Sequence, residues 1–127
     1  MASRSRLGES SEDQTKRDSR WSRSEKAIAR KACDAALKRE LQELMDETKR
    51  RADRMKKSSE LWDLECLLTG RRRDIDRKYD PRYSCLTEAL GRLLHEKRLS
   101  EEDLRGLSAD KLDLIRSFAQ FLAESVA

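Results

Sequence analysis

The sequence predicts an all-α fold, with long helices that form an extended antiparallel dimer and a small helical head on each subunit. The 127 residues include only four Gly and one Pro, and a β-rich chain needs more turn residues than that. Apolar residues recur at spacings of three and four, as they do on one face of a helix. Because 43% of the residues are charged and 5% are aromatic, a large compact core is hard to build.

The first twenty residues differ in composition from the rest of the chain. Residues 1–20 are rich in Ser, Arg, Glu and Asp and have almost no apolar content. They are predicted to form a disordered N-terminal tail, and the alternative is a short recognition arm. Residues 21–127 are predicted to form one all-helical domain, with long helices over 21–79 and a helical head over 80–127.

A first long helix begins just after Trp21. Ser22 and Glu25 form the S-x-x-E pattern of a capping box, in which each side chain satisfies a free backbone N–H. Strong helix formers continue to about Lys57, which gives roughly 35 residues, or about 50 Å of helix. Its apolar residues lie on two nearly opposite faces, one with Ile28, Ala32, Ala35 and Ala36, the other with Leu37, Leu41, Leu44, Thr48, Ala52 and Met55. The two halves are therefore expected to pack against different surfaces; a break between them is the alternative.

A second helix is expected to start at a cap on Ser58 or Ser59 and to run to about Tyr79. One stripe of this helix consists of Leu61, Leu64, Leu68, Arg72, Ile75 and Tyr79. This apolar edge is too extended for the same subunit to cover, so another chain must cover part of it. The stripe therefore predicts a homodimer.

The head is predicted from three shorter helices. Asp80-Pro81 is a stop-and-restart signal, with Asp as the cap and Pro at the first helical position. Ser100 with Asp103 opens a short helix through Leu104, and Ser108 caps the last helix. The apolar residues of the third and last helices are Tyr83, Leu86, Leu90, Leu93 and Leu94, and then Leu112, Ile115, Phe118, Phe121 and Leu122.

The sequence contains no pattern typical of an enzyme or a metal site. It has no nucleophile elbow, phosphate-binding Gly-rich loop or H-E-x-x-H motif, so no catalytic residue and no cofactor are expected. Cys33, Cys66 and Cys85 are far apart, and none forms a metal-type pair with another cysteine or with His95. They are interpreted as reduced thiols of a cytoplasmic protein. No apolar run approaches the roughly 18 residues of a membrane span.

Two residues of the second helix are candidates for protein binding. Arg72 lies at the centre of the apolar stripe, where a leucine is expected. Its stem could rest on the core with the guanidinium in solvent, or it could pair with a carboxylate across an interface, oriented by Asp76 one turn on. Trp62 lies about 100° from the stripe, so it is either an exposed anchor or part of a second packing surface.

Two basic clusters have two possible interpretations. They form either a solvated helix face or a binding surface for an acidic partner or nucleic acid. No aromatic residues interleave with them, which argues against single-strand binding and against nucleic acid as a partner. The clusters are Lys49, Arg50, Arg51, Arg54, Lys56 and Lys57, and Arg71, Arg72 and Arg73.

From Trp21 to the last helix, the sequence resembles the cyanobacterial fluorescence recovery protein family. The most specific part is an I-D-x-K-Y-D-x-R-x-S string from Ile75 to Ser84, which follows L-W-x-L at Leu61. The other residues that carry the likeness are Trp21-Ser22, Glu25, Ala29, Ala36, Arg39-Glu40-Leu41, Arg72, Leu93, Leu99, Leu104, Leu107, Asp110 and Lys111.

The resemblance implies a non-enzymatic homodimeric scaffold. Members of the family bind the photoactivated orange carotenoid protein and speed its return to the resting form, which ends photoprotective quenching. Together with the stripe, the resemblance implies dimer contacts at Leu61, Trp62, Leu64, Leu68 and Arg72. It implies partner contacts at Trp62, Arg72, Asp76, Lys78 and Lys111.

Several positions depart from the family pattern. Glu65-Cys66 replaces a His-Asp-like pair, the third helix has no aromatic residue in Thr87–Leu90, and Arg77 stands where the family has glycine. These departures lie on the expected partner surface more than on the scaffold. Two alternatives therefore remain: a family member that binds a different protein partner in an organism without that system, and a basic helical dimer that binds nucleic acid.

Overall fold

The computed structural model describes residues 21–80 and 86–126, and within these ranges it contains helices and no strands. The all-α prediction is confirmed. The predictions for the tail over 1–20 and for Pro81 and Tyr83 lie outside the described residues. The elements are α3 (Arg23–Arg54), α4 (Ser58–Lys78), α5 (Leu86–His95), the 3-10 helix η1 (Glu101–Leu104) and α6 (Ala109–Val126).

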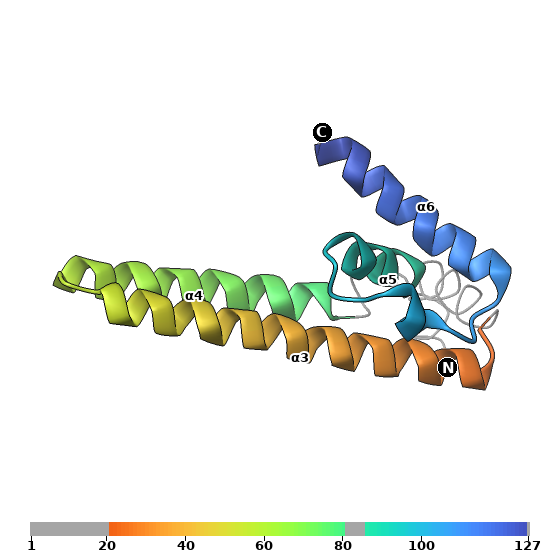
Figure 1. The fold of residues 1–127 in the computed structure, drawn as a ribbon, viewed down its shortest axis with the longest axis horizontal. Coiled ribbons are helices and arrows are strands. Elements are labelled where there is room, and N and C mark those ends of the chain that lie inside the picture. Colours follow the sequence, from red (N-terminus) through yellow and green to blue (C-terminus); the bar gives the residue numbers. More distant parts are fainter. Residues whose placement is uncertain (1–20, 81–85, 127) are drawn as a thin grey trace, which may run out of the picture.

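Helix α3 runs through its whole length without a break. At its start the predicted capping box is present: the Ser22 backbone N–H donates to Glu25 Oε1 at 3.0 Å, and the Glu25 N–H donates to Ser22 Oγ at 3.1 Å. The N-terminal half of α3 packs against the head, and the other half lies beside α4 (Figure 1). The prediction that the two halves meet different surfaces is therefore confirmed.

Helices α3 and α4 form an antiparallel hairpin, which we call the rod (Figure 1). The predicted cap at Ser58 or Ser59 is wrong, because α4 begins at Ser58 and its N-cap is Lys57. The Glu60 carboxylate accepts a hydrogen bond from the Lys57 backbone N–H at 3.2 Å, so the acid at the third helical position satisfies the free donor. Ile75 is the one buried residue of α4, with 7% of its surface exposed.

The head consists of α5, η1 and α6, and its core extends into α3. Small alanine side chains on α3 let the head approach the rod closely, and they share one cluster with the leucines of the head. The buried members of this cluster are Trp21, Ala29, Ala32, Ala36, Leu90, Leu93, Leu99, Leu104, Leu107 and Ile115. The head is therefore completed by the start of α3, which ends its contribution at Ala36, fifty residues before Leu86.

Contact between α5 and α6 depends on Gly91. A Cβ atom at this position would lie 2.9 Å from Phe118 Cβ and 3.0 Å from the Ile115 carbonyl oxygen. Gly91→Ala is therefore expected to lower the free energy of unfolding by about 1–3 kcal/mol, because overpacking outweighs the gain in helix propensity. Gly70→Ala is the control, since nothing lies within 4 Å of its Cβ position, and it should stabilise the chain by about 0.5–1 kcal/mol. Urea unfolding measures both changes. Equal changes in the free energy of unfolding for the two variants would contradict the proposed packing.

Candidate functional site

An apolar groove lies on one face of the rod, near the head. It has a volume of about 620 Å³ and is lined by Leu37 and Leu41 of α3 and by Ile75 and Tyr79 at the end of α4, with Arg72 and Asp76 beside them. Arg72 and Asp76 are exposed and lie one helical turn apart. The groove therefore combines an apolar floor with one cation and one carboxylate.

The apolar face continues from the groove toward the hairpin end of the rod. Leu61 and Arg72 differ by only about 20° around α4, so they share one face of this helix. The Leu61 side chain is 48% exposed and that of Trp62 is 63% exposed. On α3, Leu41 and Met45 are also exposed. Exposed apolar residues that continue from a groove are typical of a protein-binding surface.

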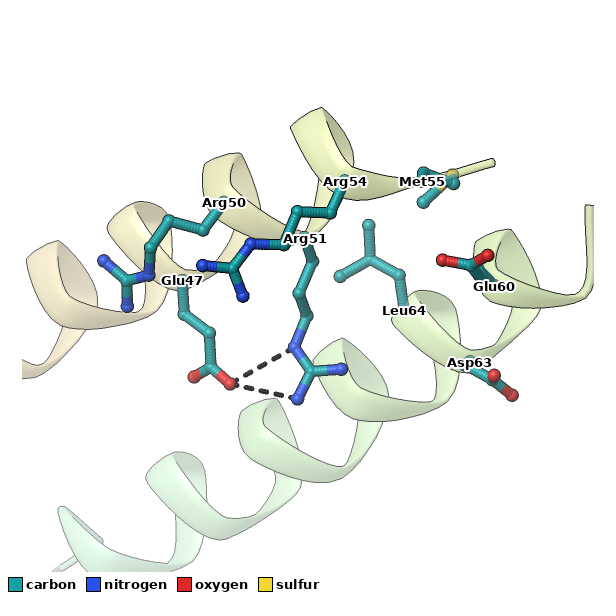
Figure 2. A pocket seen from close by; sticks show the side chains of 8 residues that line it. All are labelled: Glu47, Arg50, Arg51, Arg54, Met55, Glu60, Asp63 and Leu64. Atoms are coloured by element: carbon teal, nitrogen blue, oxygen red, sulfur yellow. Dashed lines mark hydrogen bonds and ion pairs between the residues drawn. The ribbon is translucent and has the colours of Figure 1, made fainter. Parts of the chain in front are cut away.

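The residues of the predicted dimer set differ in their exposure on the single chain. Leu61, Trp62 and Arg72 are exposed, whereas Leu64 and Leu68 are half-buried. Leu64 lines a different pocket and points toward α3 (Figure 2). Its side chain therefore takes part in the contact between the two helices of one subunit.

That second pocket, at the hairpin end, has a volume of about 550 Å³ and mixed charge. Arg51 Nε donates to Glu47 Oε2 at 3.3 Å (Figure 2), and Glu60 and Asp63 of α4 line the same pocket as the arginines of α3. The first basic cluster is thus interleaved with carboxylates, which weakens its field toward nucleic acid. The charged residues that line the pocket are Arg50, Arg51 and Arg54, with Glu47, Glu60 and Asp63.

Two predicted partner contacts, Lys78 and Lys111, are largely buried and make internal ion pairs. Lys78 Nζ lies 2.8 Å from Glu40 Oε2 and 2.8 Å from Glu96 Oε1. Lys111 Nζ lies 3.1 Å from Glu25 Oε1 and 5.3 Å from the centre of the Trp21 ring. Both lysines therefore join segments of the same chain.

Glu40 is the centre of a charged cluster where the rod meets the head. It is 3% exposed, and it accepts hydrogen bonds from Lys78 Nζ and, at 3.0 Å, from the Tyr79 hydroxyl. Burial alone would raise the pKa of Glu40, but the bonds from Lys78 and Tyr79 outweigh it, and the net effect lowers the pKa. Burial, together with the hydrogen bond to Glu40, raises the pKa of Tyr79.

Sequence reasoning did not identify this role of Glu40. A signal is present, because Glu40 follows Ala36 by one turn and so continues the buried face of α3. An acid at the end of an alanine stripe needs a buried cation.

A second carboxylate ties the start of α3 to the start of α6. Glu25 accepts hydrogen bonds from the backbone N–H groups of Ser22 and Ser108, each at 3.0 Å. These two bonds, with a further contribution from Lys111, lower the pKa of Glu25 from its ordinary 4.5 to about 2. Glu25 therefore caps the first helix of the rod and also binds the start of α6 in the head.

This arrangement predicts a specific loss of stability in acid. Because the pKa of Glu25 is lower in the folded chain than in the unfolded chain, its stabilisation is present above about pH 4.5 and is lost as the pH falls to 2. The melting temperature of the unmodified chain should fall more steeply over this range than that of Glu25→Gln. The exposed Glu102→Gln variant is the control and should follow the unmodified chain. Identical pH profiles for Glu25→Gln and the unmodified chain would contradict the role of Glu25.

The described residues contain no group of three or more His, Cys, Asp or Glu side chains that could hold a metal ion. Cys66 is exposed and Cys33 is half-buried. Among the described helices, none is both long and apolar enough to cross a membrane.

Comparison with known proteins gives consistent matches. Residues 21–119 match the family described as "Photoprotection regulator fluorescence recovery protein". The chain is 33% identical over 100 residues to the fluorescence recovery protein of Synechocystis sp. PCC 6803, an alignment that covers 79% of this chain and 92% of the relative. The solved structures of the fluorescence recovery proteins from Fremyella diplosiphon and Synechocystis match with TM-scores of 0.72 and 0.73, at 32% and 33% identity. Each match covers 79% of this chain and 98% of the other.

Proposed function

Because this chain belongs to the photoprotection regulator fluorescence recovery protein family, we propose that it binds a photoactivated orange-carotenoid-type protein and speeds its return to the resting form. The active species is a cytoplasmic homodimer. The observation that carries the proposal is the apolar groove, with the exposed Leu61 and Trp62 that continue it along the rod. Such a surface favours a protein partner over a small molecule, because it is long and open rather than enclosed.

The dimer forms through the rods. An antiparallel arrangement about a two-fold axis places the same surface of each copy against the other. Each side chain of the groove therefore contributes two equivalent contacts, one from each copy. Arg72 and Asp76 lie beside the apolar floor and have opposite charge. In the dimer, Arg72 of one copy pairs with a carboxylate of the other while the leucines are removed from water.

Regulation by such a scaffold needs no covalent chemistry. A protein that binds the compact form, or the closing transition state, more tightly than the open form shifts the population toward closure. Exposed aromatic and arginine side chains supply most of the binding free energy at such surfaces. Trp62, which is exposed on α4 and lies off the stripe that the second copy covers, has this role, and Arg72 supports it through the dimer contact.

The test is the rate at which photoactivated orange carotenoid protein recovers in the dark, with and without this chain. Addition of the chain is expected to increase the rate, and Arg72→Ala should reduce the effect by about tenfold or more, as for loss of a charge-assisted contact. Arg73→Ala is the matched control, since Arg73 is also exposed and is the next residue on α4. No increase in rate at excess chain would reject the proposed function.

A further inference from the structure

A third pocket lies where the rod meets the head, and charged side chains alone line it. Its volume is about 600 Å³, and its walls come from α3, α4, α5 and the segment after α5. Five of its residues are cationic and three are acidic, so their formal charge is +2. They are Arg71, Arg77, Lys78, Arg92 and Arg98, with Glu40, Asp74 and Glu96.

Two of the three acids are already occupied by cations of the pocket itself. Lys78 donates to Glu40 and Glu96, and Arg98 donates to Glu96 at 2.6 Å. Arg71 also pairs with Glu47, at 3.4 Å, and the formal charge of the pocket residues together with Glu47 is still positive, at +1.

Two arginines of the pocket retain unused donors. The Nε atom of Arg98 is buried and has no hydrogen-bond partner, and the Glu40 carboxylate is 3.6 Å from it. A buried donor without an acceptor is destabilising. Arg92 is exposed, and among the described residues its guanidinium has no hydrogen-bond or ion-pair partner. An acceptor group that enters the pocket can bind the exposed Arg92 guanidinium directly, and it reaches Arg98 Nε only if the Arg98 side chain turns, because that atom is enclosed.

The chemistry of the pocket selects among ligands. Pockets for small organic ligands are mostly apolar, and this one has no apolar lining residue. Guanidinium groups present planar, forked donors that match carboxylates. Walls that come from both rod and head suit an extended chain that crosses the joint.

We propose that this pocket binds an acidic segment of a protein partner, with a carboxylate side chain against Arg92 and Arg98. This inference rests on one part of the proposed function, which is that the chain acts by binding another protein. A segment bound here contacts the rod through Arg71 and the head through Arg92. It would therefore fix the angle between them while the partner is held.

The test is a titration of the full-length chain with hexaglutamate, followed through the arginine Nε–H signals in nuclear magnetic resonance spectra. The Arg98 signal is expected to shift and to saturate, and the shift should weaken as salt rises. Arg92→Glu should weaken binding by about tenfold or more, as for loss of one charge-assisted hydrogen bond. Arg30→Glu makes the same change of net charge on an exposed site of α3 outside this pocket and should leave the titration unchanged.

Three results would overturn the proposal. The Arg98 signal could stay fixed under hexaglutamate, or Arg92→Glu could have no more effect than Arg30→Glu. The Arg98 signal could also shift only when inorganic phosphate or an oligonucleotide is added at the same concentration, which would identify a different class of ligand. The titration contains no carotenoid protein, so its failure is distinct from failure of the recovery assay.

Discussion

Leu61→Glu is expected to convert the proposed dimer into monomers. The Leu61 side chain is 48% exposed on the single chain and lies on the α4 face that continues from the groove. In a two-fold dimer the substitution places two carboxylates in an apolar interface without partners. The dimer dissociation constant should rise at least about 100-fold, because burial of an unpaired charge costs several kcal/mol. Sedimentation velocity measures the change.

Leu114→Glu is the matched control for this prediction. Leu114 is 58% exposed but lies on α6 of the head and not on either helix of the rod. This variant should keep the sedimentation profile of the unmodified chain. If both variants dissociate to the same extent, or if Leu61→Glu stays dimeric, the rod is not the interface.

Glu40→Ala is expected to have the largest effect on folding. The substitution leaves the largely buried Lys78 and Arg98 without their central carboxylate, and it removes the acceptor of the Tyr79 hydroxyl. Removal of one member of a buried ion pair costs about 3–5 kcal/mol. The free energy of unfolding, measured in urea, should fall by this amount, and the joint between rod and head should loosen.

Glu43→Ala tests whether burial is the cause. Glu43 also pairs with Arg98, at 3.4 Å, but its side chain is 59% exposed. Exposed pairs contribute about 0–1 kcal/mol, so this variant should be close to the unmodified chain. A similar loss for Glu40→Ala and Glu43→Ala would contradict the central position of Glu40.

The helices could be predicted from the sequence because their signals are local. The capping box of Ser22 and Glu25 marks the start of α3, and Ser100 with Asp103 marks η1, where the Ser100 N–H donates to Asp103 Oδ2 at 3.0 Å. Absence of Gly and Pro allows α3 to run without a break. The start of α4 was wrong by one residue because Glu60, rather than a serine hydroxyl, satisfies the free backbone donor.

Pairings between distant charges could not be predicted in the same way. Glu40 and Lys78 are 38 residues apart, and in a chain with 43% charged residues many other pairs are equally plausible. Glu25 was interpreted only as a cap, although it also binds Ser108 and Lys111. Tertiary packing brings these groups together, and no local pattern encodes it.

The candidate site was predictable where it depends on helix periodicity. Arg72 interrupts the apolar stripe of α4, and the structure places it beside the groove. Leu64 belongs to the same stripe in the sequence, but it lies about 60° from Leu61 around α4 and points toward α3 (Figure 2). Periodicity assigns a residue to a face, and the neighbouring helix decides which part of that face stays open.

Sedimentation equilibrium of the unmodified chain at micromolar concentration tests most directly whether a second copy covers the rod. Each chain has a mass of 14.8 kDa. We predict a species with the mass of two chains that dissociates on dilution. A species of 14.8 kDa at every concentration would contradict the dimer and the proposed mode of action with it.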